Sequence, residues 1–134
     1  MTTQRILKVL AIIAIVFGAL TVFSGGHALF GDAQARASVG NAVGFVLWFN
    51  FCAGFAYVLT GVGLWQDRRW AAGAASLLAL ATALVTAAFG WHVMGGGAYE
   101  MRTVGALVLR LVFWVGVAAL ALHASKLAKM PHLT

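Results

Sequence analysis

The chain has 134 residues, of which 63% are hydrophobic and 9% charged, and its mean hydropathy is +0.96. This composition excludes a water-soluble domain of this size and predicts a membrane protein. The net charge is +6, but the basic residues lie where a membrane topology requires them, so we expect no nucleic-acid partner.

Four apolar runs are each long enough for a helix to cross the hydrocarbon core of a bilayer, which takes about 20 residues. The runs are continuous rather than alternating, which argues against the strands of a β-barrel. We therefore predict an all-α polytopic protein whose single membrane domain, residues 1–134, is an antiparallel four-transmembrane-helix bundle. The predicted spans cover residues 6–24, 43–65, 70–92 and 104–123.

Basic residues gather on one side of this topology. Because the positive-inside rule assigns that side to the cytoplasm, we expect a turn at 66–69, a tail at 124–134 and both termini there. The loops 25–42 and 93–103 are then external. Asp67 is expected to pair with Arg68 or Arg69. The six basic residues on the cytoplasmic side are Arg5, Lys8, Arg68, Arg69, Lys126 and Lys129.

The first apolar run also resembles a secretory signal, but it is long for one and is expected to be retained as a span. Small residues recur at four- and seven-residue spacing in three of the spans, which lets helices approach closely. We expect these rows to pack the spans against one another, with a homo-oligomer interface on any face left over. The rows comprise Ala14 and Gly18, Gly54 and Gly61, and Ala71, Ala75, Ala79, Ala83 and Ala87.

Arg110 lies inside the last span, where a charge at mid-bilayer costs roughly 2.5 to 17 kcal/mol. Counted at 1.5 Å per residue, Arg110, Asn50 and Thr86 all lie about 10 Å below the external surface. Glu100 and Arg102 lie at the mouth, and Trp114 is placed one turn beyond Arg110 to stack on its guanidinium. Two interpretations stay open: Arg110 reaches outward to Glu100 or lipid phosphate, or it binds an anionic or carbonyl-bearing ligand between spans 2, 3 and 4.

Histidines provide a weaker hypothesis. His27 and His92 end two spans on the external side, near Asp32 and Glu100, and these four side chains are a conceivable ligand set for Zn²⁺, Cu²⁺ or Ni²⁺. No two of them share a short motif spacing, however, so no metal is favoured. Haem is favoured still less, because its histidine ligands normally sit on facing helices within a bundle.

Catalytic groups are scarce. The chain has three carboxylates, no Ser or Cys placed near a His in a recognisable arrangement, and one cysteine, Cys52, which we assign to packing. An enzyme is therefore not expected. The first functional hypothesis is a non-enzymatic membrane protein that acts through association, as a homo-oligomer or an accessory subunit of a larger membrane complex. The alternative is a small-ligand binding or transport protein with an outward-facing site around Arg110.

Two stretches, WFNFCAGFAY at 48–57 and GGAYEMRTVG at 96–105, resemble a group of small uncharacterised bacterial inner-membrane proteins with four spans. The resemblance covers nearly all of the chain from Gly18 to the end of the last span. It implies a multi-pass protein of the bacterial inner membrane. It implies no site residues, since no activity is assigned to the group.

Overall fold

The chain forms four long helices in a computed structural model that describes residues 2–31, 34 and 44–129. Each is long and apolar enough to cross a membrane, and the described residues contain no strand. The protein is thus an all-α, multi-pass membrane protein, as predicted. The helices are α1 (Thr3–Phe30), α3 (Gly44–Trp65), α4 (Trp70–Met94) and α5 (Met101–Lys129).

Several helix ends differ from the ends expected from hydropathy. Helix α1 continues to Phe30, where the N–H of Gly31 bonds to the carbonyl of His27 at 3.0 Å. Helix α5 begins at Met101 and runs to Lys129, so the connection between α4 and α5 is shorter than expected. The difference arises because backbone hydrogen bonds continue a helix through small and polar residues that lower the hydropathy.

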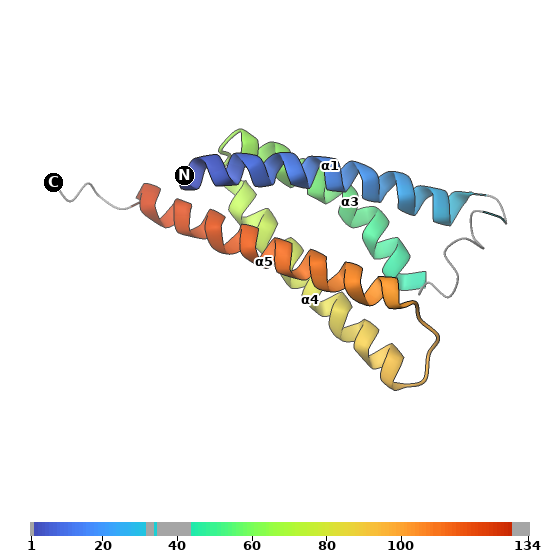
Figure 1. The fold of residues 1–134 in the computed structure, drawn as a ribbon. Coiled ribbons are helices and arrows are strands. Elements are labelled where there is room, and N and C mark those ends of the chain that lie inside the picture. The colour runs from blue at the N-terminus through green and yellow to red at the C-terminus, as the bar shows by residue number, and fades with distance from the viewer. Residues whose placement is uncertain (1, 32–33, 35–43, 130–134) are drawn as a thin grey trace.

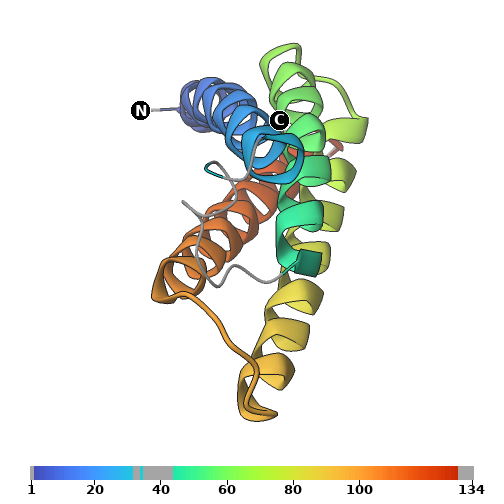
Figure 2. The same cartoon turned by 90° about the vertical axis from the view of Figure 1, so that its right-hand side faces the viewer.

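The four helices gather at one end and fan out toward the other (Figure 1). The gathered end, here the turn end, holds the start of α1, the turn at 66–69 and the last part of α5. The opposite end, the loop end, holds the last part of α1, the start of α3 and the connection at 95–100. Helix α1 packs along α3 and helix α4 packs along α5, whereas α1 and α5 are in contact over a much shorter stretch (Figure 2).

Glycines allow α1 and α3 to pack almost backbone to backbone. A Cβ atom on Gly18 would lie 2.7 Å from the carbonyl oxygen of Gly54, and one on Gly61 would lie 2.8 Å from that of Ala11. Lipid tails are as apolar as the helix surfaces, so such close van der Waals contact replaces the hydrophobic effect in holding spans together. The predicted role of these small residues in packing within the chain is confirmed.

The alanine row of α4 follows the fanned shape of the bundle. Ala71 and Ala75, near the turn end, are buried, Ala79 and Ala83 are half-buried, and Ala87 is exposed. The row therefore packs against neighbouring helices only where the helices gather.

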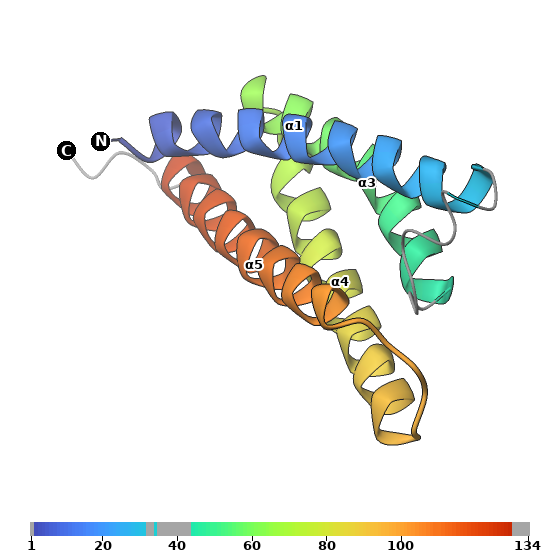
Figure 3. The same cartoon turned by 45° about the vertical axis from the view of Figure 1, so that its right-hand side comes forward.

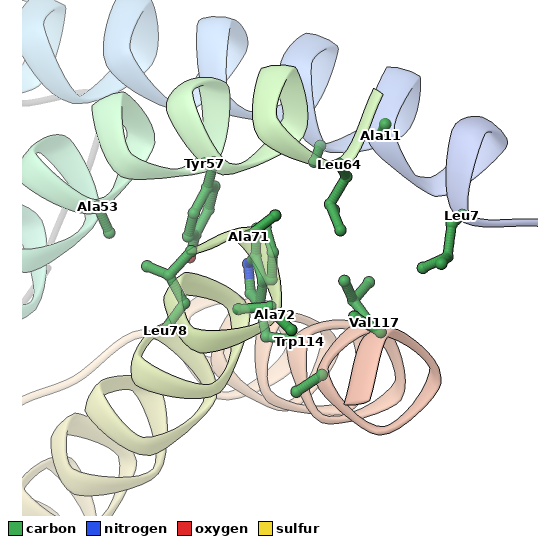
Figure 4. Close-up of a cluster of buried hydrophobic side chains, with 14 residues drawn as sticks. Leu7, Ala11, Ala53, Tyr57, Leu64, Ala71, Ala72, Leu78, Trp114 and Val117 are labelled. Carbon is green, nitrogen blue, oxygen red and sulfur yellow. The ribbon is translucent and has the colours of Figure 1, made fainter. Parts of the chain in front are cut away.

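Two apolar clusters fill the bundle at different depths. In the larger one, Tyr57 of α3 reaches toward Trp114 of α5, with their ring centroids 5.0 Å apart (Figure 4). Both side chains are fully buried. The smaller cluster, Val46, Phe89 and Leu107, joins α3, α4 and α5 toward the loop end.

The turn at 66–69 ends α3 in a Schellman arrangement. The N–H of Arg68 bonds to the carbonyl of Gly63 at 2.9 Å, that of Asp67 bonds to Leu64 at 3.3 Å, and Asp67 has φ 55°. Contrary to the expected pairing of Asp67 with Arg68 or Arg69, its carboxylate lies 4.0 Å from Lys8 Nζ, while Arg68 Nε donates to Gln66. The reason is that Lys8 of α1 is brought to the turn, where its Nζ also donates to the Trp65 carbonyl at 3.1 Å.

Candidate ligand-binding site

Arg110 points into the bundle. It lies in the third turn of α5, only 9% of its surface is exposed, and its guanidinium carbon lies 5.0 Å from the centroid of the Phe17 ring of α1. This is cation–π geometry, in which the negative face of the ring attracts the charge. The interpretation in which Arg110 reaches outward to the surface therefore does not match the direction of its side chain.

No carboxylate of the described residues forms an ion pair with Arg110. Asp67 lies at the turn end beside Lys8. Glu100 precedes Arg110 by ten residues, which corresponds to about 15 Å along a helix axis. Asp32 lies outside the described residues. Within the described part of the chain, the guanidinium is thus balanced by an aromatic ring and not by an opposite charge.

Arg110 lines a cavity of about 270 Å³ toward the loop end, here called the Arg110 cavity. Helix α5 contributes Arg110 and helix α3 contributes Asn50, while α1 forms most of the remaining wall. The structure brings Asn50 and Arg110, which residue counting placed at a similar depth, to one cavity. Its lining is Phe17, Leu20, Thr21, Ser24, Gly25, Ala28, Leu47, Asn50 and Arg110.

Four buried polar atoms on α3 and α5 make no hydrogen bond of standard geometry among the described residues, although the Tyr57 hydroxyl lies close enough to Arg110 and Trp114 to interact with both: Asn50 Oδ1, Tyr57 Oη, Arg110 Nε and Trp114 Nε1. Asn50 and Tyr57 are seven residues apart, and Arg110 and Trp114 four, so each pair projects from one face of its helix. Guanidinium and indole N–H groups only donate. The group is therefore richer in donors than in acceptors, which suits a ligand that carries oxygen acceptors.

The hydroxyl groups of Thr21 and Thr86 bond to their own helices. Thr21 Oγ1 donates to the Phe17 carbonyl at 2.7 Å, and Thr86 Oγ1 donates to the Thr82 carbonyl at 2.7 Å. Thr86 does not line the Arg110 cavity. The sequence interpretation placed span 3, with Thr86, beside Arg110 and Asn50. In the structure helix α1 forms that wall of the cavity instead, and Thr86 of α4 lies elsewhere in the bundle.

The other predicted site residues lie apart from the cavity. Trp114 packs its ring against Tyr57 rather than on the Arg110 guanidinium, whose aromatic contact is Phe17. Glu100 and Arg102 lie where α5 begins, and each has interactions of its own. Sequence reasoning missed Phe17. A signal existed for it, because Phe17, Thr21 and Ser24 are spaced as one helix face that interrupts the aliphatic residues of span 1.

The two histidines of the metal hypothesis have separate surroundings. The ring of His27 lies parallel to Phe23 with centroids 6.5 Å apart. The His92 ring contacts the following connection, where Nε2 lies 2.9 Å from the Ala98 carbonyl oxygen. Among the residues that the structure describes, no three His, Cys, Asp or Glu side chains are placed to hold a metal ion. The predicted ligand Asp32 lies outside those residues, and Glu100 is at the start of α5.

No protein-family model, curated protein or solved structure matches this chain. The site must therefore be interpreted from its own geometry. A buried guanidinium beside a cavity, with an amide lining the same cavity from a second helix, can bind an anion or a carbonyl group.

Proposed function

We propose that this chain is a multi-pass protein of the bacterial inner membrane that binds a small anionic or carbonyl-bearing ligand at Arg110. One observation carries the proposal: a buried guanidinium lines a cavity, yet no carboxylate of the described residues pairs with it. Intramembrane charges are costly and mark functional sites when they face a cavity. A bound anion would supply a countercharge that the described residues do not provide.

The unpartnered polar atoms support a ligand over a purely structural role for Arg110. A buried donor or acceptor without a partner costs about 1 to 3 kcal/mol. A residue retained only to hold α5 in register would be expected to have its hydrogen bonds filled by neighbouring helices. Here neither Arg110 Nε nor Asn50 Oδ1 has a hydrogen-bond partner among the described residues, and both residues line the cavity.

Basic residues support the orientation of this site. The start of α1, the turn at 66–69 and the last part of α5 come together at the turn end, and these segments carry the six basic residues of the predicted cytoplasmic side. The positive-inside rule places the turn end in the cytoplasm. The Arg110 cavity, toward the loop end, would then lie in the outer leaflet.

The test compares small anions retained by the wild-type protein and by Arg110→Met, each purified in mild detergent and analysed by mass spectrometry after denaturation. We expect an anion in the wild type that is lost from Arg110→Met and kept in the matched variant Arg102→Met, which removes a charge outside the cavity. Circular dichroism verifies that the variants are helical. Identical sets of retained anions in all three proteins would refute the proposal.

Association remains the second candidate function, as a homo-oligomer or an accessory subunit. It is favoured by the outer face of α5, where Gly105 and Gly116 are exposed and a Cβ atom on either would meet nothing within 4 Å. Glycine on such a face permits a close approach by another helix. Gly116→Leu should lower the mass of any assembly seen by native mass spectrometry, and a wild-type protein that is only monomeric would contradict this role.

A further inference from the structure

The lining of the Arg110 cavity combines polar and apolar side chains. Arg110, Asn50 and Ser24 are polar, whereas the hydroxyl of Thr21 donates to a carbonyl of its own helix. The apolar wall is formed by Phe17, Leu20, Ala28 and Leu47. A ligand that matches both parts needs an anionic group and a hydrocarbon portion.

The size of the cavity suits only part of such a molecule. Sites for whole small-molecule ligands usually measure about 300 to 1,000 Å³, and the Arg110 cavity measures about 270 Å³. A head group with its first methylene groups fits this volume, whereas a long chain must continue outside it. The chain therefore needs an apolar medium at the opening.

On two sides of the cavity, described residues of neighbouring helices pack together. On the α3, α4 and α5 side, Val46, Phe89 and Leu107 pack together. On the α1 and α3 side, the two helices are in close contact, and Phe51 lies 3.1 Å from where a Cβ atom on Gly25 would stand. The remaining side lies between α1 and α5, which approach at the turn end and diverge toward the loop end (Figure 3).

Leu20 marks the opening on that remaining side. It lines the cavity, and 61% of its surface is exposed, so it lies at the rim rather than in the interior. An exposed leucine in the middle of a membrane span faces hydrocarbon. Among the described residues, the rim of the cavity thus lies beside Leu20.

From these features we infer that the ligand is an anionic amphiphile, with a carboxylate or phosphate head group, that enters sideways between α1 and α5. Its head group binds the Arg110 guanidinium beside Asn50, and its hydrocarbon chain stays in the bilayer past Leu20. This inference rests on the proposed function, because it names the class of the anion that Arg110 binds. A guanidinium pairs with either head group through two parallel N–H bonds.

The experiment uses the full chain in nanodiscs of neutral phosphatidylcholine, with phosphatidylglycerol, oleate or the soluble head-group mimic glycerol phosphate added in separate arms. Native mass spectrometry measures the amount of each probe bound per chain. We expect phosphatidylglycerol or oleate to bind, and which of them binds distinguishes a bilayer phospholipid from a free fatty acid. Arg110→Met should weaken that binding about 30-fold or more, the loss typical when one member of a buried charge pair is removed.

A second pair of variants tests the sideways opening. Leu20→Trp places a large ring at the rim and should slow or block uptake of the amphiphile. Leu84→Trp is the matched control, because Leu84 of α4 is similarly exposed, 63% against 61%, and does not line the cavity. Equal uptake by the two tryptophan variants would overturn the sideways route.

The soluble arm separates failure of this inference from failure of the proposed function. If glycerol phosphate binds in an Arg110-dependent way while the amphiphiles do not, the proposed anion binding at Arg110 is supported and the inference that the ligand is an amphiphile is refuted. If no probe binds in an Arg110-dependent way and no anion is retained on purification, the proposed function fails as well.

Discussion

Replacing Gly18 by alanine tests the backbone packing of α1 against α3. The added Cβ would stand 2.7 Å from the Gly54 carbonyl oxygen, about 0.7 Å inside the 3.4 Å at which ordinary contact begins. The obstacle is backbone of the neighbouring helix and cannot rotate away, so α1 must shift. Overpacking of this kind costs about 1 to 3 kcal/mol, and alanine's better helix propensity returns up to about 1 kcal/mol.

We therefore expect Gly18→Ala to lower the free energy of unfolding by up to about 3 kcal/mol. The assay is unfolding of the purified protein in mixed micelles of increasing denaturing detergent, followed by circular dichroism. Gly73→Ala is the control, since a Cβ atom there would meet nothing within 4 Å, and it should be neutral or stabilising. A Gly18→Ala protein as stable as the Gly73→Ala protein would refute the close packing.

Three further predictions use the same unfolding assay. Tyr57→Phe removes a buried hydroxyl without a partner among the described residues, so the free energy of unfolding should stay the same or rise by up to about 1 kcal/mol; a clear fall would mean that the hydroxyl is bonded. Asp67→Gly should be about 1 kcal/mol more stable than Asp67→Ala, because φ is 55° at this position and glycine alone adopts it without strain; equal stabilities would contradict the left-handed turn. Arg110→Met replaces a buried charge by an apolar side chain of similar length, so the ligand-free protein should gain up to a few kcal/mol, whereas a large loss would show that Arg110 holds the bundle together.

The sequence predicted the architecture well because the length and hydropathy of each span follow directly from the thickness of the bilayer. Counting residues also put Asn50 and Arg110 at one depth, since the rise of a helix is fixed. Depth does not say which helix a side chain faces, however. Arg110 points to Phe17 of α1, and Thr86 lies away from the cavity, because each helix is apolar nearly all round and hydropathy cannot tell which spans are neighbours.

The pairing of Asp67 was missed for a related reason. Charges adjacent in sequence suggested Arg68 or Arg69, but a Schellman turn directs consecutive side chains apart, and the partner Lys8 comes from a helix distant in the chain. The four unpartnered polar atoms were likewise beyond prediction. Their number and position depend on which rings fill the space between α3 and α5, and sequence spacing alone does not specify that packing.

The contact between Arg110 and Phe17 has a consequence for biogenesis. Chains are synthesised from the N-terminus, so α1 and α3 are present before α5 emerges from the ribosome. An arginine near the centre of an isolated span adds about 2.5 to 3.5 kcal/mol to the cost of insertion. The Phe17 ring that contacts the guanidinium and the Asn50 amide that lines the same cavity belong to the two helices made first. Arg110, the residue whose insertion costs the most free energy, therefore enters the membrane only after these two residues are in place.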